Sequence, residues 1–484
     1  MEDFRRAADA VAADIAAGRL RPGDRLPPQR AFARSRGIAA STAARVYREL
    51  ARRGLVVGEV GRGTFVRAAE RPPGPALAEP ADARVDLELN YPVAPGQSAL
   101  LAAGLERLRR PDVLDAVLGP AGVAGTAAAR EAAAELLAAP GWRPEAAGVL
   151  FAGNGRQAIA GAVAALVPPG GRLAVEALTY PVIKGVAARL GVTLVPVAMD
   201  EEGLRPDALA EVHRTAPLGA VYVQPTLHNP YGTTMPPRRR AELAGTLDRL
   251  GLHAIEDRVW AFLPEDAPEP LAAFAPGRTV LVDSLSKRLA PGLSLGFAVP
   301  PAELSGRLAA ALRSGGWGPA GFALDAAAGW MADGTVEAVT AAKRADAAAR
   351  RRIAAGRLGG AAVRWGPCSY FGWWELPTRW RAETFVAAAA RHGIAVTPAA
   401  AFVVGGAAAP ARSASASPHR PRTPWPARSA SSPASPPAAR TTPPSTDRPR
   451  CREPVTNRRA PPRPPTPPAA PGRRPRPAPP PTGG

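Results

Sequence analysis

Lysine is rare in this chain, so the position of each one is informative. Lys184, Lys287 and Lys343 are the only three in 484 residues. Lys287 lies between a predicted strand and a turn that contains Pro and Gly, flanked by Ser284 and Ser286. An amine that forms a Schiff base must be partly deprotonated and held at the mouth of a site, and in open α/β sheets such sites form where parallel strands end. Lys287 is therefore the candidate nucleophile, with the two serines as donors to a cofactor phosphate; the alternative is an ordinary surface lysine.

The elements that must position Lys287 follow an alternating pattern. Over residues 86–410, apolar β-type runs alternate with Ala- and Leu-rich helical stretches. This pattern predicts an α/β domain with a mostly parallel sheet, here called the body. Its predicted strands include residues 171–175, 220–224, 253–256 and 279–283.

Residues 1–67, here called the head, have a different pattern. Apolar residues at helical spacing over 4–17 predict a first helix, which Gly18 ends. A Pro-rich turn leads into a second helix that stops at Gly37, and a third helix is predicted over 41–54. Two short β-type runs around a glycine-bearing turn follow, up to Val66. Three helices and such a wing are typical of DNA-binding domains whose third helix enters the major groove.

Charge and composition separate the remaining regions. The net charge of +20 comes mainly from the ends: residues 1–70 carry 14 Arg against 8 acids, and residues 411–484 carry 14 Arg against Asp447 and Glu453. Residues 68–85 are rich in Pro and Ala and predict a linker. Residues 411–484 contain almost no large aliphatic residues, so we expect a disordered tail.

Several classes of protein are disfavoured by the same composition. Two cysteines, Cys368 and Cys451, cannot form a disulfide framework or a zinc site, and no metal is expected. No run of eighteen apolar residues is present, and residues 1–6 lack a secretory pattern. We therefore expect a cytoplasmic protein that does not contact a membrane.

The head resembles the GntR family of regulators. The matching segments are residues 20–30, the helix that contains Thr42 and Arg45, and the wing over 61–66. The resemblance implies that double-stranded DNA is the partner, with the wing entering the minor groove. The DNA-facing residues that it implies are Arg30, Ser41, Thr42, Arg45, Arg62 and Gly63. The family often has Ser-Arg where this chain has Ala39 and Ala40, which removes a helix N-cap and a phosphate contact.

The body resembles fold-type I aminotransferases, and the whole chain resembles the MocR-type regulators that fuse such a domain to a GntR head. The resemblance implies pyridoxal 5′-phosphate (PLP) as cofactor, held covalently by Lys287. Asp257 would pair with the pyridine nitrogen, Asn229 would bond the 3-oxygen and Tyr180 would stack on the ring. A phosphate site would be formed by Asn154, Gly155, Arg156, Ser284 and Ser286. Each residue also has a structural alternative, such as a turn former or a helix cap.

Three departures from the family pattern stand out. Ser294 occupies the place of a phosphate-binding arginine, and Trp260 that of a tyrosine that helps hold the 3-oxygen. No residue after 406 matches the arginine that would grip a substrate carboxylate. The abrupt change near residue 410 suggests a reading-frame shift that replaces a final strand and helix, which resequencing would test. The competing interpretation is a genuine basic tail that adds non-specific DNA affinity.

Three functions are compatible with these features. The first is a transcription regulator whose body binds PLP and senses it, or an amino acid or amine, as a head-to-tail homodimer. The second is a PLP-dependent aminotransferase that carries a DNA-binding appendage, so enzymatic activity stays open. The third is a regulator whose body has lost PLP and serves only for dimerisation.

Overall fold

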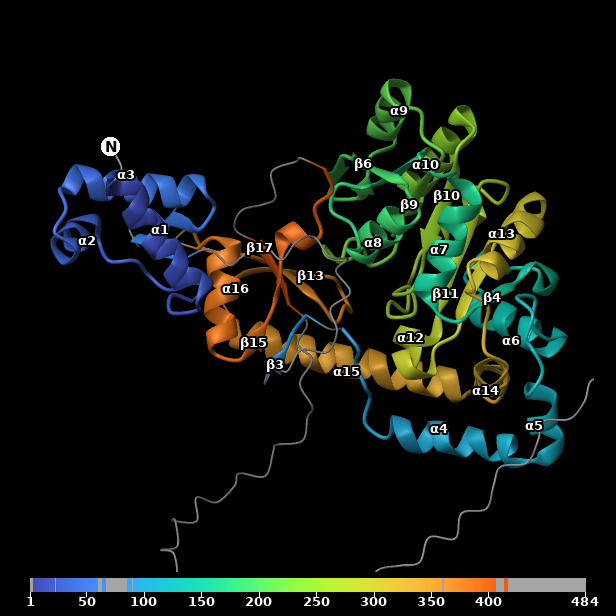
Figure 1. Ribbon diagram of the computed structural model, residues 1–484. Coiled ribbons are helices and arrows are strands. Elements are labelled where there is room, and N and C mark those ends of the chain that lie inside the picture. Colours follow the sequence, from blue (N-terminus) through green and yellow to red (C-terminus); the bar gives the residue numbers. More distant parts are fainter. Residues whose placement is uncertain are drawn as a thin grey trace, which may run out of the picture. The chain divides into compact units, whose positions relative to one another are not determined.

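The computed structural model describes residues 3–21, 23–59, 63–66, 85–88, 90–358, 361–378, 380–405 and 413–416. In this part of the chain, no helix is both long and apolar enough to cross a bilayer. Figure 1 shows the course of the chain from the helical head to the α/β body.

The head has the three helices and the wing that its sequence predicts. Its elements are α1 (Asp3–Ala16), α2 (Gln29–Arg36), α3 (Ala40–Arg52), β1 (Val56–Glu59) and β2 (Gly63–Val66). One apolar cluster holds them together, because α3 buries Ala43, Val46, Tyr47 and Leu50 at helical spacing. The Tyr47 hydroxyl donates to the carbonyl of Pro27 and so ties α3 to the turn before α2. Burial raises the pKa of Tyr47 to about 12.

The start of α3 lacks a side-chain cap, as its sequence predicts. Ala39 is the N-cap residue, with φ −65° and ψ 148°, and no side chain accepts a bond from the first turn. A Ser or Thr at such a position contributes about 0.5–2 kcal/mol. The helix therefore depends on its buried face for stability.

The centre of the body is a seven-stranded sheet of order β4-β12-β11-β10-β9-β5-β6. Every pairing in it is parallel except the two that β12 makes, with β11 and β4. The strands expected over 171–175, 220–224, 253–256 and 279–283 are present as β5, β9, β10 and β11. The strands of the sheet are β4 (Leu150–Ala152), β5 (Arg172–Glu176), β6 (Thr193–Val197), β9 (Ala220–Val223), β10 (His253–Asp257), β11 (Thr279–Ser284) and β12 (Gly296–Val299).

Helices cover both faces of this sheet (Figure 1). Leu173 and Val175 of β5 pack with α7, α8 and α13, whereas Ala174 between them packs with α9, α10 and α11. Burial on both faces explains why the strands are continuously apolar. The helices named so far are α7 (Gly155–Leu166), α8 (Val182–Arg189), α9 (Pro206–Thr215), α10 (Pro237–Leu250), α11 (Leu271–Phe274) and α13 (Ala302–Ser314).

A second layer of helices extends the core beyond β4 and β12. Their apolar faces pack on Phe151 and Phe297, whose rings meet edge to face at 6.0 Å. These segments are α4 (Gln97–Leu105), η1 (Glu106–Arg109), α5 (Pro111–Val117), α6 (Ala127–Leu137), η2 (Ala146–Gly148), α12 (Leu285–Arg288), η3 (Pro291–Leu293), α14 (Gly321–Ala332) and α15 (Thr335–Arg357).

The C-terminal part of the body forms a smaller sheet of order β13-β14-β17-β16. A parallel pair of β15 with β3, from the start of the body, lies outside this sheet, as does the antiparallel pair of β7 with β8. The elements are β3 (Val85–Asp86), β7 (Met199–Asp200), β8 (Gly203–Leu204), β13 (Ala362–Trp365), β14 (Gly372–Glu375), α16 (Ala382–Arg391), β15 (Ile394–Ala395), β16 (Thr397–Pro398), η4 (Ala399–Ala401) and β17 (Ser413–Ala416).

Two expected boundaries need correction. The body was expected to end at residue 410, but residues 413–416 form β17, which pairs with both β14 and β16. A strand therefore lies beyond the expected end of the body, and the reading-frame hypothesis stays a prediction for resequencing to test. Val85 was expected in the linker, but it pairs with Ile394. The rest of the expected linker, 68–84, and the expected disordered tail from 417 onward lie outside the described residues.

Candidate functional site

The predicted cofactor residues gather at one edge of the large sheet. Four parallel strands end there, at Ala152, Glu176, Asp257 and Ser284. Strand β12 runs the other way and begins there, because Gly296 pairs with Ser284 and with Ala152. The loops after these strands therefore converge, which is the usual place of a ligand site in such sheets.

Lys287 projects into a partly buried setting between aromatic rings. It lies in α12, directly after β11, and its Nζ is 4.0 Å from the ring centroid of Tyr91 and 5.0 Å from that of Trp260. The Nζ also donates to the carbonyl of Asn90. Burial, followed by the positive charges of Arg156 and Lys343, holds the pKa of Lys287 well below its usual range. A neutral amine is the nucleophilic form, so the geometry supports the chemistry predicted for Lys287.

Asp257 ends β10 as a buried carboxyl group. Its Oδ2 accepts bonds from the Tyr222 hydroxyl at 2.6 Å and from Gln224 Nε2 at 3.0 Å. Its Oδ1 accepts from the backbone N–H of Val259 at 3.0 Å. Burial, opposed by these bonds, raises the pKa of Asp257 to about 6. The end of β10 thus holds a carboxyl group whose ionised form a positively charged partner would stabilise.

Tyr180 and Arg156 form a pair at the same edge. Burial raises the pKa of the Tyr180 hydroxyl, and a hydrogen bond with Arg156 opposes that rise. Arg156 also donates to the Tyr91 hydroxyl at 3.0 Å. The backbone next to Tyr180 is anchored, because Thr179 N donates to the carbonyl of Phe402. The Tyr180 segment is thus held by a side-chain bond to Arg156 and by a backbone bond to Phe402.

The segment that carries Asn229 is anchored by buried polar groups. Gln224 Oε1 accepts from Asn229 N at 3.3 Å, and Gln224 N donates to Glu176. His228 Nε2 lies 2.9 Å from the carbonyl of Leu178 and 3.3 Å from Glu176. The amide side chain of Asn229 itself has no hydrogen-bond partner within the described ranges, which leaves it available to a ligand.

A polar cradle lies where α7 begins. Asn154 caps α7 by accepting from Gln157 N at 3.0 Å. A Cβ on Gly296 would lie 2.3 Å from the Asn154 carbonyl, and one on Gly155 would lie 2.9 Å from Ser284 Oγ. Only glycine therefore allows the start of a twelve-residue helix to approach the end of β11 and the start of β12. The backbone amides exposed there favour an anion.

Hydroxyl groups complete the cradle. Ser284 Oγ and Ser286 Oγ are 2.6 Å apart. Leu285 N donates to the carbonyl of Leu295 at 2.9 Å, which brings the Ser294 segment alongside. Ser294 Oγ is buried and has no hydrogen-bond partner in the described part of the chain. Arg156 directly follows Gly155 of this cradle. Ser294 supplies a hydroxyl group where the family pattern has a positive charge.

The predicted DNA-facing residues lie in the head. Arg30 and Ser41 are exposed, and Thr42 is partly exposed. Arg45 is exposed too, and its guanidinium lies 4.1 Å from the ring centroid of Phe4 in α1. Arg48 on the same helix is exposed and has no ion-pair partner among the described residues, so it joins the candidates that sequence reasoning missed.

Gly63 has a second reason to be glycine. It begins β2 with φ +120°, and a Cβ there would lie 2.7 Å from Arg25 Nε. Arg25 forms a bridge with Phe65 and therefore lies across the wing. In this structure the backbone of Gly63 lies close to the Arg25 side chain. The close approach of Gly63 to DNA stays a prediction. Arg62 lies outside the described residues.

Sequence reasoning also missed groups of the body that contact Lys287 or Asp257 from distant parts of the chain. Asn90 and Tyr91 come from the start of the body, and Tyr222 from inside β9. Asn90 Oδ1 is buried without a partner in the described ranges. The available signal was the polar pair Asn90 and Tyr91 before Pro92, close to the predicted linker. Nothing in the local sequence indicates that this pair contacts Lys287.

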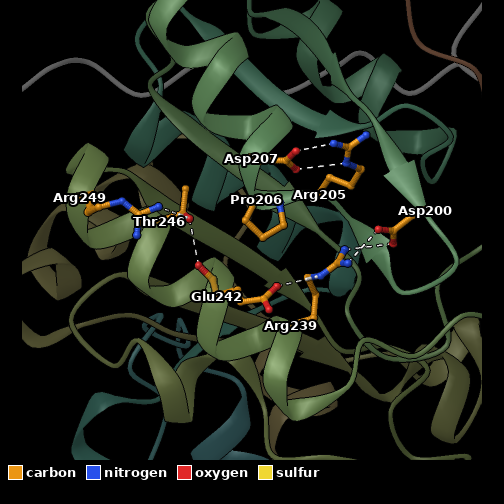
Figure 2. Close-up of a pocket in the computed structure, with 8 residues that line it drawn as sticks. All are labelled: Asp200, Arg205, Pro206, Asp207, Arg239, Glu242, Thr246 and Arg249. Atoms are coloured by element: carbon orange, nitrogen blue, oxygen red, sulfur yellow. Dashed lines mark hydrogen bonds and ion pairs between the residues drawn. The ribbon is translucent and has the colours of Figure 1, made fainter.

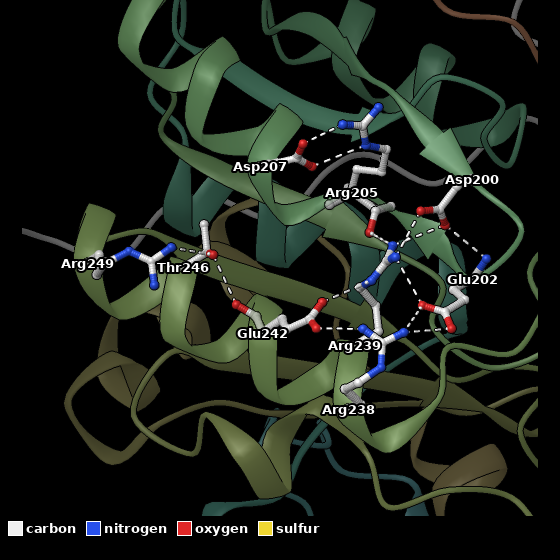
Figure 3. Close-up of polar contacts among 10 residues, drawn as sticks. Asp200, Glu202, Arg205, Asp207, Arg238, Arg239, Glu242, Thr246 and Arg249 are labelled. Carbon is white, nitrogen blue, oxygen red and sulfur yellow. Dashed lines mark hydrogen bonds and ion pairs between the residues drawn. The ribbon is translucent and has the colours of Figure 1, made fainter.

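A separate open pocket of about 500 Å³ lies beside α9 and α10 (Figure 2). Its lining residues are Asp200, Arg205, Pro206, Asp207, Arg239, Glu242, Thr246 and Arg249. The acids there are already paired: Arg239 binds Asp200 at 2.8 Å, and Arg238 binds Glu242 at 2.6 Å (Figure 3). The pocket shares no residue with the site around Lys287, and its charges largely compensate one another.

Two family models match the chain. Residues 119–413, more than half of it, match the model of aminotransferase class I and II, and residues 4–66 match that of the bacterial regulatory proteins of the gntR family. The protein is thus an α/β aminotransferase-like domain that carries a winged-helix DNA-binding domain. The chain belongs to the aminotransferase class I and II family, and its gntR head makes it a transcription regulator of the MocR type.

Curated and solved proteins agree with this assignment. YdeF, an uncharacterized HTH-type transcriptional regulator of Bacillus subtilis, is 27% identical and covers 83% of this chain and 87% of its own. PtsJ of Salmonella typhimurium, a vitamin B6 salvage pathway transcriptional repressor, is 28% identical over 63% of this chain and 70% of its own. The multiple substrate aminotransferase of Thermococcus profundus shares the fold, with a TM-score of 0.62, 22% identity and coverage of 71% and 88%.

Proposed function

We propose that this chain is a DNA-binding transcription regulator whose body binds PLP and senses it, or an amino acid or amine. One observation carries the proposal: a Lys287 amine of lowered pKa shares a sheet edge with a buried Asp257, on the same chain as a gntR head. A regulator needs its ligand site and its DNA surface on one molecule so that binding at one can alter the other.

The residues at the sheet edge fit PLP. Lys287 would hold its aldehyde carbon, Asp257 its ring nitrogen and Asn229 its 3-oxygen, with Tyr180 against the ring. The cradle of Asn154, Gly155, Arg156, Ser284 and Ser286 would hold its phosphate. The unpartnered Ser294 Oγ and Asn90 Oδ1 support the fit, since buried polar atoms normally have partners. When bound, PLP supplies a ring that withdraws electrons from an amine-bearing carbon.

Sensing is favoured over turnover. An aminotransferase needs a cation for the substrate carboxylate, and sequence analysis found none after residue 406 that matches. The sequence places Arg412 directly before β17, so this arginine is the position to test if transamination of an amino acid with a keto acid is measured. The name of PtsJ ties one relative to vitamin B6, which favours PLP or a related ligand as the signal. We place this activity in the cytoplasm, where bacterial DNA is found.

A homodimer is the proposed assembly, because one face of the body exposes large apolar side chains. Leu118 is 80% exposed after α5, and Phe322 is 50% exposed on α14. The two helices touch, since a Cβ on Gly321 would lie 2.7 Å from the carbonyl of Val117. Neighbouring exposed apolar side chains support an interface here, and a second copy in head-to-tail orientation would give two heads for two DNA half-sites.

The double variant Leu118→Asp/Phe322→Asp is expected to dissociate this dimer. Two carboxylates buried at an interface without partners should raise the dissociation constant more than tenfold. Sedimentation velocity over a range of concentrations gives the measurement. Ile353→Asp, at an exposed apolar residue of α15, is the matched control. A wild-type monomer, or a double variant with unchanged mass, would contradict the proposal.

DNA binding tests the function itself. Fluorescence anisotropy with DNA from upstream of the protein's own coding region should show binding that PLP changes about 5- to 150-fold, the usual range of coupling between sites. Arg30→Ala should weaken binding about tenfold and lower the salt slope by about one, as the loss of a phosphate contact does. Arg214→Ala, an exposed arginine of the body, is the control. If the affinity for DNA is the same with and without PLP, the body does not sense PLP, and dimerisation is the role that remains for it.

A further inference from the structure

Lys343 is a buried lysine that the proposed function leaves unused. It lies on α15, is fully buried, and its Nζ donates to two backbone carbonyls of the α12 segment, those of Lys287 at 2.8 Å and of Leu289. No other lysine contacts the α12 segment, since Lys184 donates to the carbonyls of Ala400 and Ala401. An ammonium group on the carbonyl of Lys287 fixes the backbone from which the reactive side chain departs.

The carbonyl of Leu289 also connects Lys343 to the segment that contacts the Lys287 amine. Gln97 Nε2 on α4 donates to the carbonyl of Leu289 at 3.2 Å, and Gln97 Oε1 accepts from Ala94 N at 3.1 Å. Ala94 follows Asn90 and Tyr91, which contact the Lys287 amine. The carbonyl of Leu289 therefore links α15 and α4, and through Gln97 it links them to the loop that contacts Lys287.

Lys343 is itself held on its own helix. Tyr370 Oη donates to the carbonyl of Lys343 at 2.7 Å, and Asp346 lies one turn further along α15, bonded by Arg350 at 2.6 Å. Burial, opposed by the charge of Asp346, lowers the pKa of Lys343 to about 7. Its bonds to two carbonyls hold the buried amine in place.

We propose that Lys343 is a positioning residue for the Lys287 amine, acting through its two bonds to the carbonyls of Lys287 and Leu289. This rests on the proposed role of Lys287 as the cofactor lysine. The groups that set the charge of Lys287 are Arg156 from α7, Lys343 from α15 and Asp257 from β10, with the Tyr91 ring from the start of the body. Of these, only Lys343 also holds the backbone of α12.

Removal of Lys343 has two consequences that act in one direction. The α12 segment loses two bonds, so the Lys287 amine gains access to water, and a nearby positive charge disappears. Both changes favour protonation of Lys287 and move its pKa up toward the ordinary value. A lysine that served only for stability would lower the melting temperature without this effect.

The test is amine labelling of the full-length protein, dialysed against hydroxylamine to remove any bound aldehyde. Acetic anhydride labels neutral amines, and with only three lysines the modification of Lys287 is read by mass spectrometry as a function of pH. In Lys343→Met, the midpoint pH for Lys287 labelling is expected to rise by about one unit, a tenfold loss of neutral amine at fixed pH. Lys343→Arg, which keeps a charged donor, should return the midpoint most of the way to the wild-type value.

Lys184→Met is the matched control, because Lys184 also donates to two carbonyls but lies in α8. An unchanged midpoint in Lys343→Met, or the same rise in Lys184→Met, would overturn the proposal. If circular dichroism shows that Lys343→Met is unfolded, Lys343→Gln replaces it and is judged by the same midpoint. Because labelling needs no PLP, failure of PLP binding is seen separately, as an absent visible absorbance band in a protein whose Lys287 still labels.

Discussion

Lys287→Ala is expected to remove all visible absorbance that the purified protein shows with PLP. A lysine-bound PLP absorbs at about 420 nm, and the amine that would make this bond is the one at the sheet edge. The other lysines cannot replace it, because Lys184 and Lys343 direct their amines at backbone carbonyls. The loss should therefore be complete rather than partial.

The measurement combines spectra with chemical trapping. Borohydride reduction fixes PLP on its lysine, so mass spectrometry of the wild type should find the added mass on the peptide that contains Lys287. Lys184→Ala keeps the sheet edge intact and should retain both the band and the adduct. A band that persists in Lys287→Ala would mean that PLP is bound elsewhere. No band in the wild type would favour a body that has lost the cofactor.

The sequence predicts the parts of the site that lie next to recognisable strands. Asp257 and Lys287 directly follow or end apolar runs, and the structure brings both to one edge because parallel strands end together. Asn154 and Gly155 were identified for the same reason, at the start of a helix that follows β4. Short-range rules suffice where a strand, a turn and a helix follow one another.

Long-range contacts could not be predicted from local pattern. Asn90 meets Lys287 across 197 residues of sequence, and Lys343 meets it across 56. An Ala-rich helix gives no sign that one of its lysines faces inward. Strand β17 was also missed, because its residues are only Ser and Ala, and its pairing with β14 depends on backbone bonds that every residue can make.

The stability of the body is expected to depend on pH through Asp257. Its folded pKa of about 6 lies above the ordinary value of 3.8, so the folded state favours the protonated carboxyl group. The folded protein then binds more protons than the unfolded chain between these values, and stability falls as pH rises from about 4 through 6. Without a cationic partner, ionised Asp257 costs about 3 kcal/mol above that window.

Asp257→Asn should remove this dependence. In urea unfolding without PLP, the wild type should lose about 2 kcal/mol more than Asp257→Asn between pH 4.5 and 7.5. The asparagine oxygen can still accept the bonds from Tyr222 and Gln224, but the bond from Val259 N is lost. This loss lowers the unfolding free energy at both pH values, so only its change between them is diagnostic. Other titrating groups cancel, because they are present in both proteins.

PLP provides the second half of the same prediction. A protonated pyridine nitrogen beside Asp257 stabilises the carboxylate, so PLP should raise the wild-type unfolding free energy more at pH 7.5 than at pH 4.5. In Asp257→Asn, the stabilisation by PLP should be smaller, and the part of its pH dependence that comes from Asp257 should be absent. If PLP stabilises both proteins equally at both pH values, Asp257 does not hold the ring nitrogen. Its raised pKa would then reflect burial among Tyr222 and Gln224 alone.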